Sequence, residues 1–255
     1  MKKSKFLVTG NRSGLGRYLF EALPCYGLNR EIGIDNYRND SFDTIVHCAN
    51  NKSRDIDNAN LYNYLYDNVL LTYELTKIPH NKFIYISTVD VYPKNMKVHK
   101  EDEVINIEEI DSIYGLTKLM SEQIVINNCK NHLILRPTAL LGPYIKSNAL
   151  TKLLDNDIEN FTLSELSTFN YVTHEQILEV INTAMKDNLM GIFNLATNKN
   201  LNLLQISKLL RLKNFIFGPY IYDIQYIDNS KIKKLFSTFN QKTSEIMEQF
   251  IKERL

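Results

Sequence analysis

The chain has 255 residues, a net charge of +1 and a hydrophobic fraction of 44%. These values are ordinary for a globular protein that buries its core without disulfides or metals. The balanced charge argues against binding to nucleic acid or to an anionic membrane. Three cysteines without CxxC spacing argue against a disulfide framework or a zinc site, so we expect no metal and a cytoplasmic location. No stretch approaches the roughly 18 apolar residues of a membrane span.

Apolar runs alternate with amphipathic segments along the chain. We expect strands at 5–9, 31–35, 44–49, 82–88, 132–137 and 191–197, and helices at 14–23, 58–77, 113–129, 173–186, 201–210 and 241–255. This alternation predicts an α/β fold, a Rossmann-like doubly wound parallel sheet with a small C-terminal substrate lobe. In a single compact unit, we expect residues 1–137 and 171–197 to form the dinucleotide-binding core, and residues 138–170 and 198–255 to form the lobe.

A glycine-rich turn lies between the first expected strand and helix, in KFLVTGNRSGLGRYLFEAL (5–23). Strand, glycines and helix form the context of a dinucleotide-binding loop, although an ordinary strand-to-helix turn is an alternative. Gly10 would allow a tight turn, Gly14 the approach of a pyrophosphate, and Gly16 close helix packing. The helix N-terminus would then bind the phosphates. We therefore expect cofactor contacts at Gly10, Asn11, Arg12, Ser13, Gly14, Leu15 and Gly16.

The adenosine side of the cofactor is expected near Asp35, which ends the second expected strand. An acidic residue about 20 positions after the glycines binds the ribose hydroxyls and repels a 2′-phosphate, which favours NAD(H). Arg12 and Arg38 keep NADP(H) open, because either guanidinium could meet that phosphate. Asp35, Asn36 and Arg38 are thus expected cofactor contacts.

A Y-x-x-x-K pattern occurs twice, at Tyr73–Lys77 and at Tyr114–Lys118. On a helix the lysine lies on the same face as the tyrosine and would lower the phenol pKa from about 10 toward neutrality. Such a tyrosine can exchange a proton with a carbonyl or an alcohol while a hydride moves. Only Tyr114 follows the strand that ends at Thr88, at the sheet edge where ligands bind. We therefore expect catalysis at Thr88, Tyr114 and Lys118, and packing at Tyr73.

Taken in order, these motifs resemble an extended short-chain dehydrogenase/reductase, the NAD-dependent epimerase/dehydratase family that acts on nucleotide sugars. The matching segments are VTGNRSGLG (8–16), IDN (34–36), IVHCANNK (45–52), DNVLLT (67–72), FIYISTVDVYP (83–93), YGLTK (114–118), LRPTALLGP (135–143), NYVTHEQ (170–176) and GIFNLAT (191–197). The resemblance implies an NAD(P)-dependent reductase or epimerase/dehydratase that moves hydride to or from a sugar-like carbonyl or alcohol.

Individual roles follow from the resemblance. Thr88 would hold the reacting oxygen, with Ser87 as the alternative, Tyr114 would transfer its proton, and Lys118 would also hold the nicotinamide ribose. Further cofactor contacts are implied at His47, Cys48, Ala49, Lys52, Asn68, Pro137 and Thr138, and substrate contacts at Thr88, Val89, Tyr114 and Ala139. The resemblance also implies a homodimer through helices 58–77 and 113–129.

The sequence departs from the family pattern at several places. Its glycines do not follow G-x-x-G-x-x-G, and residues 36–43 leave no room for the usual further strand and helices. Ala139 stands where an Asn often touches the sugar nucleotide, and the C-terminal lobe is short. These departures motivate an alternative, a non-catalytic NAD(P)-binding regulator or scaffold on the same fold. The Thr88, Tyr114 and Lys118 set favours the enzyme, since a sensor needs none of these residues.

Overall fold

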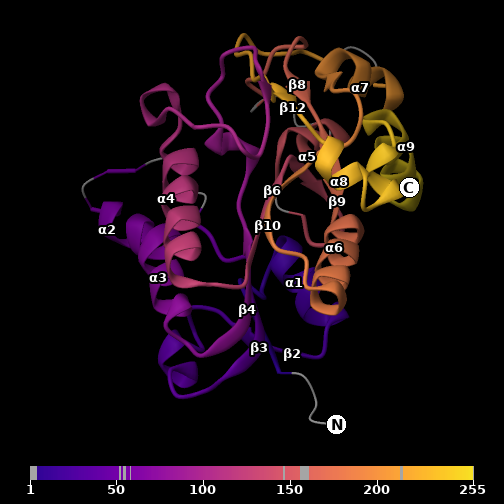
Figure 1. The fold of residues 1–255 in the computed structure, drawn as a ribbon. Coiled ribbons are helices and arrows are strands. Elements are labelled where there is room, and N and C mark those ends of the chain that lie inside the picture. Colours follow the sequence, from indigo (N-terminus) through magenta and orange to yellow (C-terminus); the bar gives the residue numbers. More distant parts are fainter. Residues whose placement is uncertain are drawn as a thin grey trace.

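A six-stranded sheet forms the centre of the computed structural model, which describes residues 5–51, 53, 56–57, 59–145, 147–155, 161–212 and 215–254 (Figure 1). The strands run parallel in the order β2-β1-β3-β4-β6-β10. They are β1 (Phe6–Thr9), β2 (Cys25–Leu28), β3 (Phe42–His47), β4 (His80–Ile86), β6 (His132–Pro137) and β10 (Gly191–Leu195). The predicted α/β fold, a Rossmann-like doubly wound sheet, is confirmed.

Helices cover both faces of this sheet. α1 (Gly14–Ala22) and α6 (His174–Asp187) pack on one face. The other face carries α2 (Leu61–Leu65), a π-helical turn (Tyr66–Leu70), α3 (Leu71–Thr76) and α4 (Ile113–Asn128) (Figure 1). Neighbouring strand residues such as Leu7 and Val8 are fully buried in different clusters, one on each face. Burial on both faces explains why the strands read as continuous apolar runs.

The second strand is not where we expected it. β2 begins three residues after α1 ends, and residues 31–35 instead contain Gly33 with φ +70° and the start of a 3-10 turn, Ile34–Tyr37. Pro24 and Gly27 hid β2, because both residue types are unfavourable in strands. Gly27 leaves room for the Asn11 side chain and the Phe20 ring, since an added Cβ would overlap them unless both moved. β2 and β3 lie on opposite sides of β1, so the strand order reverses between β1 and β3. No further strand flanks β2 in the described sheet.

The remaining strands and helices lie outside the central sheet and the helices named above. They are β5 (Val98–His99), β7 (Ala139–Leu141), α5 (Ala149–Leu154), β8 (Thr168–Phe169), β9 (Tyr171–Thr173), β11 (Leu201–Asn202), α7 (Leu203–Leu209), β12 (Tyr226–Ile227), α8 (Ser230–Lys233) and α9 (Thr243–Arg254). Leu141, Leu150, Phe169, Leu203 and Ile246 belong to a separate apolar cluster. The division into core and lobe stays a prediction. Among the described residues, no helix combines the length and hydropathy needed to cross a membrane.

Candidate active site

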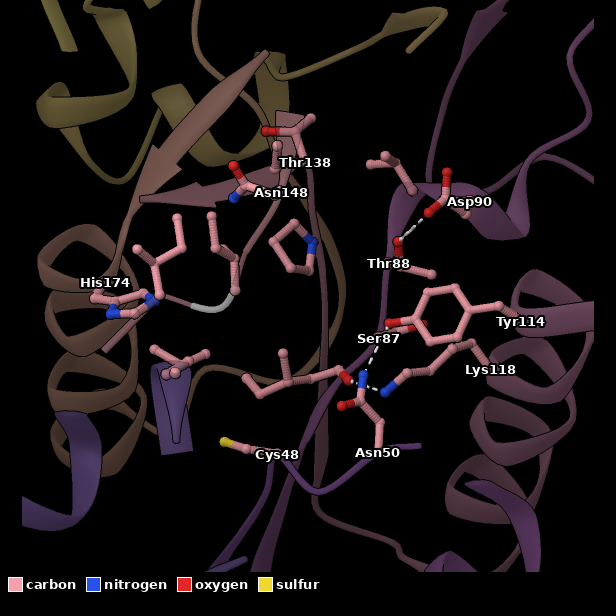
Figure 2. A pocket seen from close by; sticks show the side chains of 18 of the residues that line it. Cys48, Asn50, Ser87, Thr88, Asp90, Tyr114, Lys118, Thr138, Asn148 and His174 are labelled. Atoms are coloured by element: carbon pink, nitrogen blue, oxygen red, sulfur yellow. Dashed lines mark hydrogen bonds between the residues drawn. The ribbon is translucent and has the colours of Figure 1, made fainter. Parts of the chain in front are cut away.

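A cavity of about 310 Å³ opens at the carboxyl ends of the central strands (Figure 2). Its walls come from the turn after β1, the loops after β3, β4 and β6, the start of α4, and the segment that follows α7. This edge is where doubly wound sheets bind ligands. The polar side chains that line it include Cys48, Asn50, Ser87, Thr88, Asp90, Tyr114, Lys118, Thr138, Asn148, His174 and Tyr222.

The glycine-rich turn forms one wall of the cavity through Ser13, Gly14, Leu15 and Gly16. Gly10 has φ +72°, and an added Cβ there would lie 3.0 Å from Ala49 Cα and N. A Cβ on Gly16 would overlap the Gly10 carbonyl oxygen. Gly14 has φ +55°, and an added Cβ there would make only an ordinary contact, 3.9 Å from the Tyr144 carbonyl oxygen. Its backbone conformation, and not its packing, therefore favours glycine.

This turn fits a dinucleotide. α1 begins at the cavity, and its first turn carries no acidic side chain that would oppose a phosphate. The Gly14 N–H donates to the Tyr144 carbonyl oxygen at 2.9 Å, so one donor of this helix end is bonded within the chain. The Tyr144 ring lies 3.9 Å from the Arg17 guanidinium, and its hydroxyl donates to Glu21.

The residues that we expected to contact the adenosine part of the cofactor do not follow the second strand directly. Asp35 lies seven residues beyond the end of β2, and its 85% exposed side chain pairs with Arg38 at 2.5 Å. The Asn36 side chain donates to the Ile32 carbonyl oxygen. The expectation that Asp35 ends the second strand is therefore wrong, and with it the reason for placing Asp35, Asn36 and Arg38 against the adenosine ribose.

Other polar residues follow β2 directly. Asn29 donates to Asn11 Oδ1 at 3.0 Å, and this pair joins the end of β2 to the glycine-rich turn. Arg30 pairs with Asp67 at 2.5 Å, and Arg12 pairs with Glu31. The end of β2 thus carries a guanidinium beside an amide pair, where we expected a carboxylate.

The two candidate hydroxyls after β4 have different partners. Ser87 donates to Glu122 Oε1 at 2.5 Å, and Glu122 is fully buried. Thr88 donates to Asp90 Oδ2 at 3.2 Å and accepts from the Asp90 N–H. Ser87 is bonded to a carboxylate inside the protein, whereas the carboxylate that binds Thr88 itself lines the cavity, so Thr88 is the better candidate for the hydroxyl that meets a ligand.

Tyr114 lies in the first turn of α4 and lines the cavity together with Lys118. Ser112 caps the start of the helix, and its hydroxyl accepts from the Gly115 N–H at 2.9 Å. A Cβ on Gly115 would overlap the Asp90 carbonyl oxygen, so the Tyr–Gly pair lets α4 start against the turn that carries Thr88. By contrast, Tyr73 is 41% exposed with Lys77 over its ring at 3.9 Å, and this second Y-x-x-x-K pair lies away from the residues lining the cavity.

The expected effect of Lys118 on Tyr114 is not met in this structure. Lys118 Nζ donates to the Ile86 carbonyl at 2.7 Å and lies 5.9 Å from the centre of the Tyr114 ring. Burial raises the pKa of the Tyr114 phenol well above its usual value, and the Asp90 charge raises it further. A hydrogen bond from Asn50 lowers it. A phenol of ordinary pKa, about 10, is already neutral at pH 7, and the rise keeps Tyr114 in the form that can donate a proton.

The other expected contacts divide into two groups. Cys48, Val89, Pro137, Thr138 and Ala139 line the cavity. His47 instead bonds with Thr9 at 2.7 Å and Thr72 at 3.0 Å, and Asn68 uses both its amide atoms on the Asn51 backbone. Asn68 thus holds the loop after β3, and His47 anchors the end of that strand. Ala49, on the same loop, lies against Gly10. Lys52 lies outside the described residues.

Sequence reasoning missed several residues of the cavity, namely Asn50, Asp90, Asn148, His174 and Tyr222. Asn50 and Asp90 could have been found, because each follows a strand at the ligand-binding edge. Tyr222 donates to Asp90 Oδ1 at 3.2 Å from a segment without regular secondary structure, and no local pattern marks it.

Solved structures that resemble this fold include enzymes of sugar nucleotides. UDP-glucuronic acid 4-epimerase from Bacillus cereus, solved with NAD and a fluorinated UDP-glucuronic acid, is 20% identical over 98% of this chain and 100% of its own, with a TM-score of 0.77. dTDP-4-dehydrorhamnose reductase from Bacillus anthracis, solved with NADP, is 17% identical over 98% and 99%, with a TM-score of 0.76. The Yersinia enterocolitica reductase is 19% identical over 99% and 100%, with a TM-score of 0.78.

At these identities the solved structures establish the fold alone. No curated protein matches the sequence significantly. The model of the NAD dependent epimerase/dehydratase family matches residues 28–181, more than half of the chain. This matched region contains the Thr88 turn, the Tyr114 and Lys118 pair and the cavity wall after β6. The chain therefore belongs to the NAD dependent epimerase/dehydratase family.

Proposed function

We propose that the protein is an NAD(P)-dependent reductase or epimerase/dehydratase whose substrate is a sugar-like carbonyl or alcohol, carried on a nucleotide. One observation carries this proposal: the Thr88 and Tyr114 side chains line the same cavity as the glycine-rich turn. A proton-transferring phenol is thereby close to the surface that fits a dinucleotide. A protein that only binds cofactor has no use for this arrangement.

When bound, the nicotinamide supplies or accepts the hydride. Ser13, Gly14 and Gly16 would hold the pyrophosphate at the start of α1. Thr88 would bind the reacting oxygen, with its hydroxyl oriented by Asp90. Tyr114, whose phenol is neutral near pH 7, would donate its proton to a carbonyl oxygen during reduction and recover it during oxidation. Lys118 fixes the Ile86 carbonyl and would hold the nicotinamide ribose.

The choice between NAD(H) and NADP(H) belongs to this proposal. Without a carboxylate directly after β2, the reason to prefer NAD(H) is lost. Arg30 follows β2, and Arg12 lies in the glycine-rich turn with 60% of its side chain exposed. Guanidinium groups bind phosphate well, which supports recognition of a 2′-phosphate at this end.

The experiment compares two tyrosines that share a motif. Purified wild type, Tyr114→Phe and Tyr73→Phe would be incubated with each nicotinamide cofactor and a panel of UDP- and dTDP-sugars, including 4-keto forms. Cofactor absorbance would report reduction, and NMR would report epimerisation or dehydration. We expect Tyr114→Phe to lose at least about 100-fold in kcat, the range of general acid–base catalysis, and Tyr73→Phe to match wild type.

The alternative, a non-catalytic regulator, makes a different prediction. Wild type would bind a nicotinamide cofactor, detected as a rise in Tm, but would turn over no member of the panel. Equal activity of Tyr114→Phe and wild type would reject the assigned role of Tyr114. Within the enzyme proposal, cofactor retained through purification supports epimerisation, because a reductase exchanges its cofactor in each cycle.

We also propose that two copies pair through the helices covering one sheet face. α3 and α4 lie side by side there (Figure 1). Large apolar side chains remain exposed on these helices and the segment before them, namely Leu61, Tyr62, Leu70, Tyr73, Ile113 and Met120. Such a patch favours association. We expect a dimer in analytical ultracentrifugation and a monomer for Met120→Glu, while a wild-type monomer would reject this interface.

A cytoplasmic location is proposed from the cysteines. Cys25, Cys48 and Cys129 are all free thiols in the structure. Free thiols persist in a reducing compartment. Fractionation of cells that express the tagged protein would test this location.

A further inference from the structure

Asn50 contacts the oxygen atom that our proposed reaction uses. It follows β3 on the loop that begins at Cys48, and its side-chain nitrogen donates to the Tyr114 hydroxyl oxygen at 3.1 Å (Figure 2). Both side chains line the cavity. The contact joins two segments that are 64 residues apart in the sequence.

The loop that carries Asn50 is held on both sides. On one side, the Thr9 hydroxyl accepts from the N–H groups of Cys48 at 3.1 Å and Ala49 at 3.0 Å. On the other side, the Asn68 amide accepts from the Asn51 N–H at 2.8 Å and donates to the Asn51 carbonyl at 3.0 Å. Because Thr9 and Asn68 are buried, these anchors place Asn50 at a fixed distance from α4.

The direction of the bond constrains the phenolic proton. Asn50 donates, so the Tyr114 oxygen accepts, and the hydrogen of the phenol must point away from Asn50. We propose that Asn50 is a positioning residue for Tyr114, which turns the phenolic O–H toward a ligand and stabilises the oxygen when it carries a negative charge. This inference rests on the proposed function, in which Tyr114 exchanges a proton with the substrate.

The charged and titratable groups around the phenol make this donor important. Burial raises the pKa of the Tyr114 phenol, and so do Asp90 on the turn after β4 and Tyr64 on α2. Tyr114 in turn raises the pKa of Tyr85 on β4, which burial already raises. Lys118 on α4 donates to Ile86. A hydrogen bond donated to the charged form lowers a pKa, and Asn50 is the group that does so for Tyr114.

The test measures the ionisation of residue 114 directly. Site-specific 3,5-difluorotyrosine at this position, whose phenol is more acidic than that of tyrosine, would be titrated by ¹⁹F NMR. The titration would compare the wild-type background with Asn50→Ala, Asn50→Asp and Asn51→Ala. Asn51 is the matched control, because its side chain lies on the same loop but donates to Asp67 at 3.0 Å.

We expect Asn50→Ala to lower the phenolate-to-phenol ratio at a given pH about tenfold, the weight of one hydrogen bond to a charged group. Asn50→Asp should lower this ratio more, because a carboxylate repels the phenolate. Asn51→Ala should change it less than twofold. A change below twofold in Asn50→Ala, or an equal change in Asn51→Ala, would overturn the inference.

This titration needs no substrate, so its failure is distinguishable from failure of the proposed function. In an active enzyme, a second readout follows. Asn50→Ala should shift the acidic limb of the pH profile of kcat for alcohol oxidation to higher pH, with wild-type activity recovered above that limb. A uniform loss at every pH would also overturn the inference.

Discussion

Arg136 and Glu122 form an ion pair inside the protein, with Nη2 and Oε2 2.6 Å apart and side chains 4% and 0% exposed. Arg136 Nε also donates to Glu122 Oε1 at 3.0 Å. The pair extends in two directions: Ser87 donates to Glu122, and Arg136 donates to the Tyr92 hydroxyl at 2.7 Å. A charged network therefore lies directly beneath the turn that holds Thr88.

Loss of one partner should strongly destabilise the fold. We expect Glu122→Gln to lower the free energy of unfolding by about 3–5 kcal/mol, because a buried guanidinium is left without its counter-charge. Urea denaturation followed by circular dichroism would measure this change. The double variant Glu122→Met with Arg136→Met should lose less than the sum of its single variants. Additive losses would contradict the coupling.

The two glycines at the start of α1 should tolerate alanine differently. Gly16→Ala should cost about 3 kcal/mol or more, since its Cβ would overlap the Gly10 carbonyl oxygen. Gly14→Ala should cost about 1–2 kcal/mol, the strain of a positive φ at a position where the new Cβ meets no close neighbour. Gly33, at φ +70° with nothing near its Cβ, is the matched control for that strain. Thermal and urea denaturation would compare them, and equal losses at Gly16 and Gly33 would contradict the packing argument.

His47 should make the protein sensitive to acid. Burial lowers its pKa to about 3, and the Lys118 charge contributes. The unfolded chain binds a proton below the ordinary histidine pKa of about 6.5, whereas the native side chain stays neutral. Stability attributable to His47 is thus fully present above pH ~6.5 and falls toward pH ~3 by up to about 1.4 kcal/mol per pH unit.

A His47→Gln variant tests this origin, because glutamine keeps polar atoms near Thr9 and Thr72 without titrating. Urea denaturation between pH 4.5 and pH 7.5 should give the variant a shallower dependence on pH. His80 remains as an internal reference, since burial lowers its pKa as well. Identical slopes in variant and wild type would reject His47 as the source.

Arg30 and Arg12, which lie near β2, should determine whether the protein prefers NADPH or NADH. Arg30→Gln and Arg12→Gln should weaken NADPH binding about tenfold, and change NADH binding less than twofold, because only NADPH carries the 2′-phosphate. Isothermal titration calorimetry would give both constants. Asp35→Asn is the control and should affect neither, given its distance from β2 and its pairing with Arg38. Tighter NADPH binding in Asp35→Asn would restore the role we first expected for that carboxylate.

Much of this fold follows from local pattern. Five of the six expected sheet strands overlap observed ones, since strands buried on both faces are long apolar runs. The exception, β2, is a four-residue edge strand that contains Gly27. Its glycine leaves room for Asn11 and Phe20, and tertiary contacts of that kind leave no local signal.

The site was predictable to the extent that topology decides it. Thr88, Tyr114 and Lys118 could be chosen over Tyr73 and Lys77 because strand ends meet at one edge. The hydrogen-bond partners of these residues could not be predicted from the sequence. Whether Lys118 faces the phenol or the Ile86 carbonyl depends on ångström-scale packing. The contact of Tyr222 with Asp90 depends on a segment without a period.

The bond between the Gly14 N–H and the Tyr144 carbonyl has a consequence for phosphate binding. A dinucleotide phosphate that uses this N–H must exchange with Tyr144, so it gains less than it would from a donor bonded to water. Tyr144 is tied to α1 through Arg17 and Glu21, while the next residue, Ile145, lines the cavity. One backbone donor is thus contested between ligand and chain, at a segment whose next residue lines the cavity.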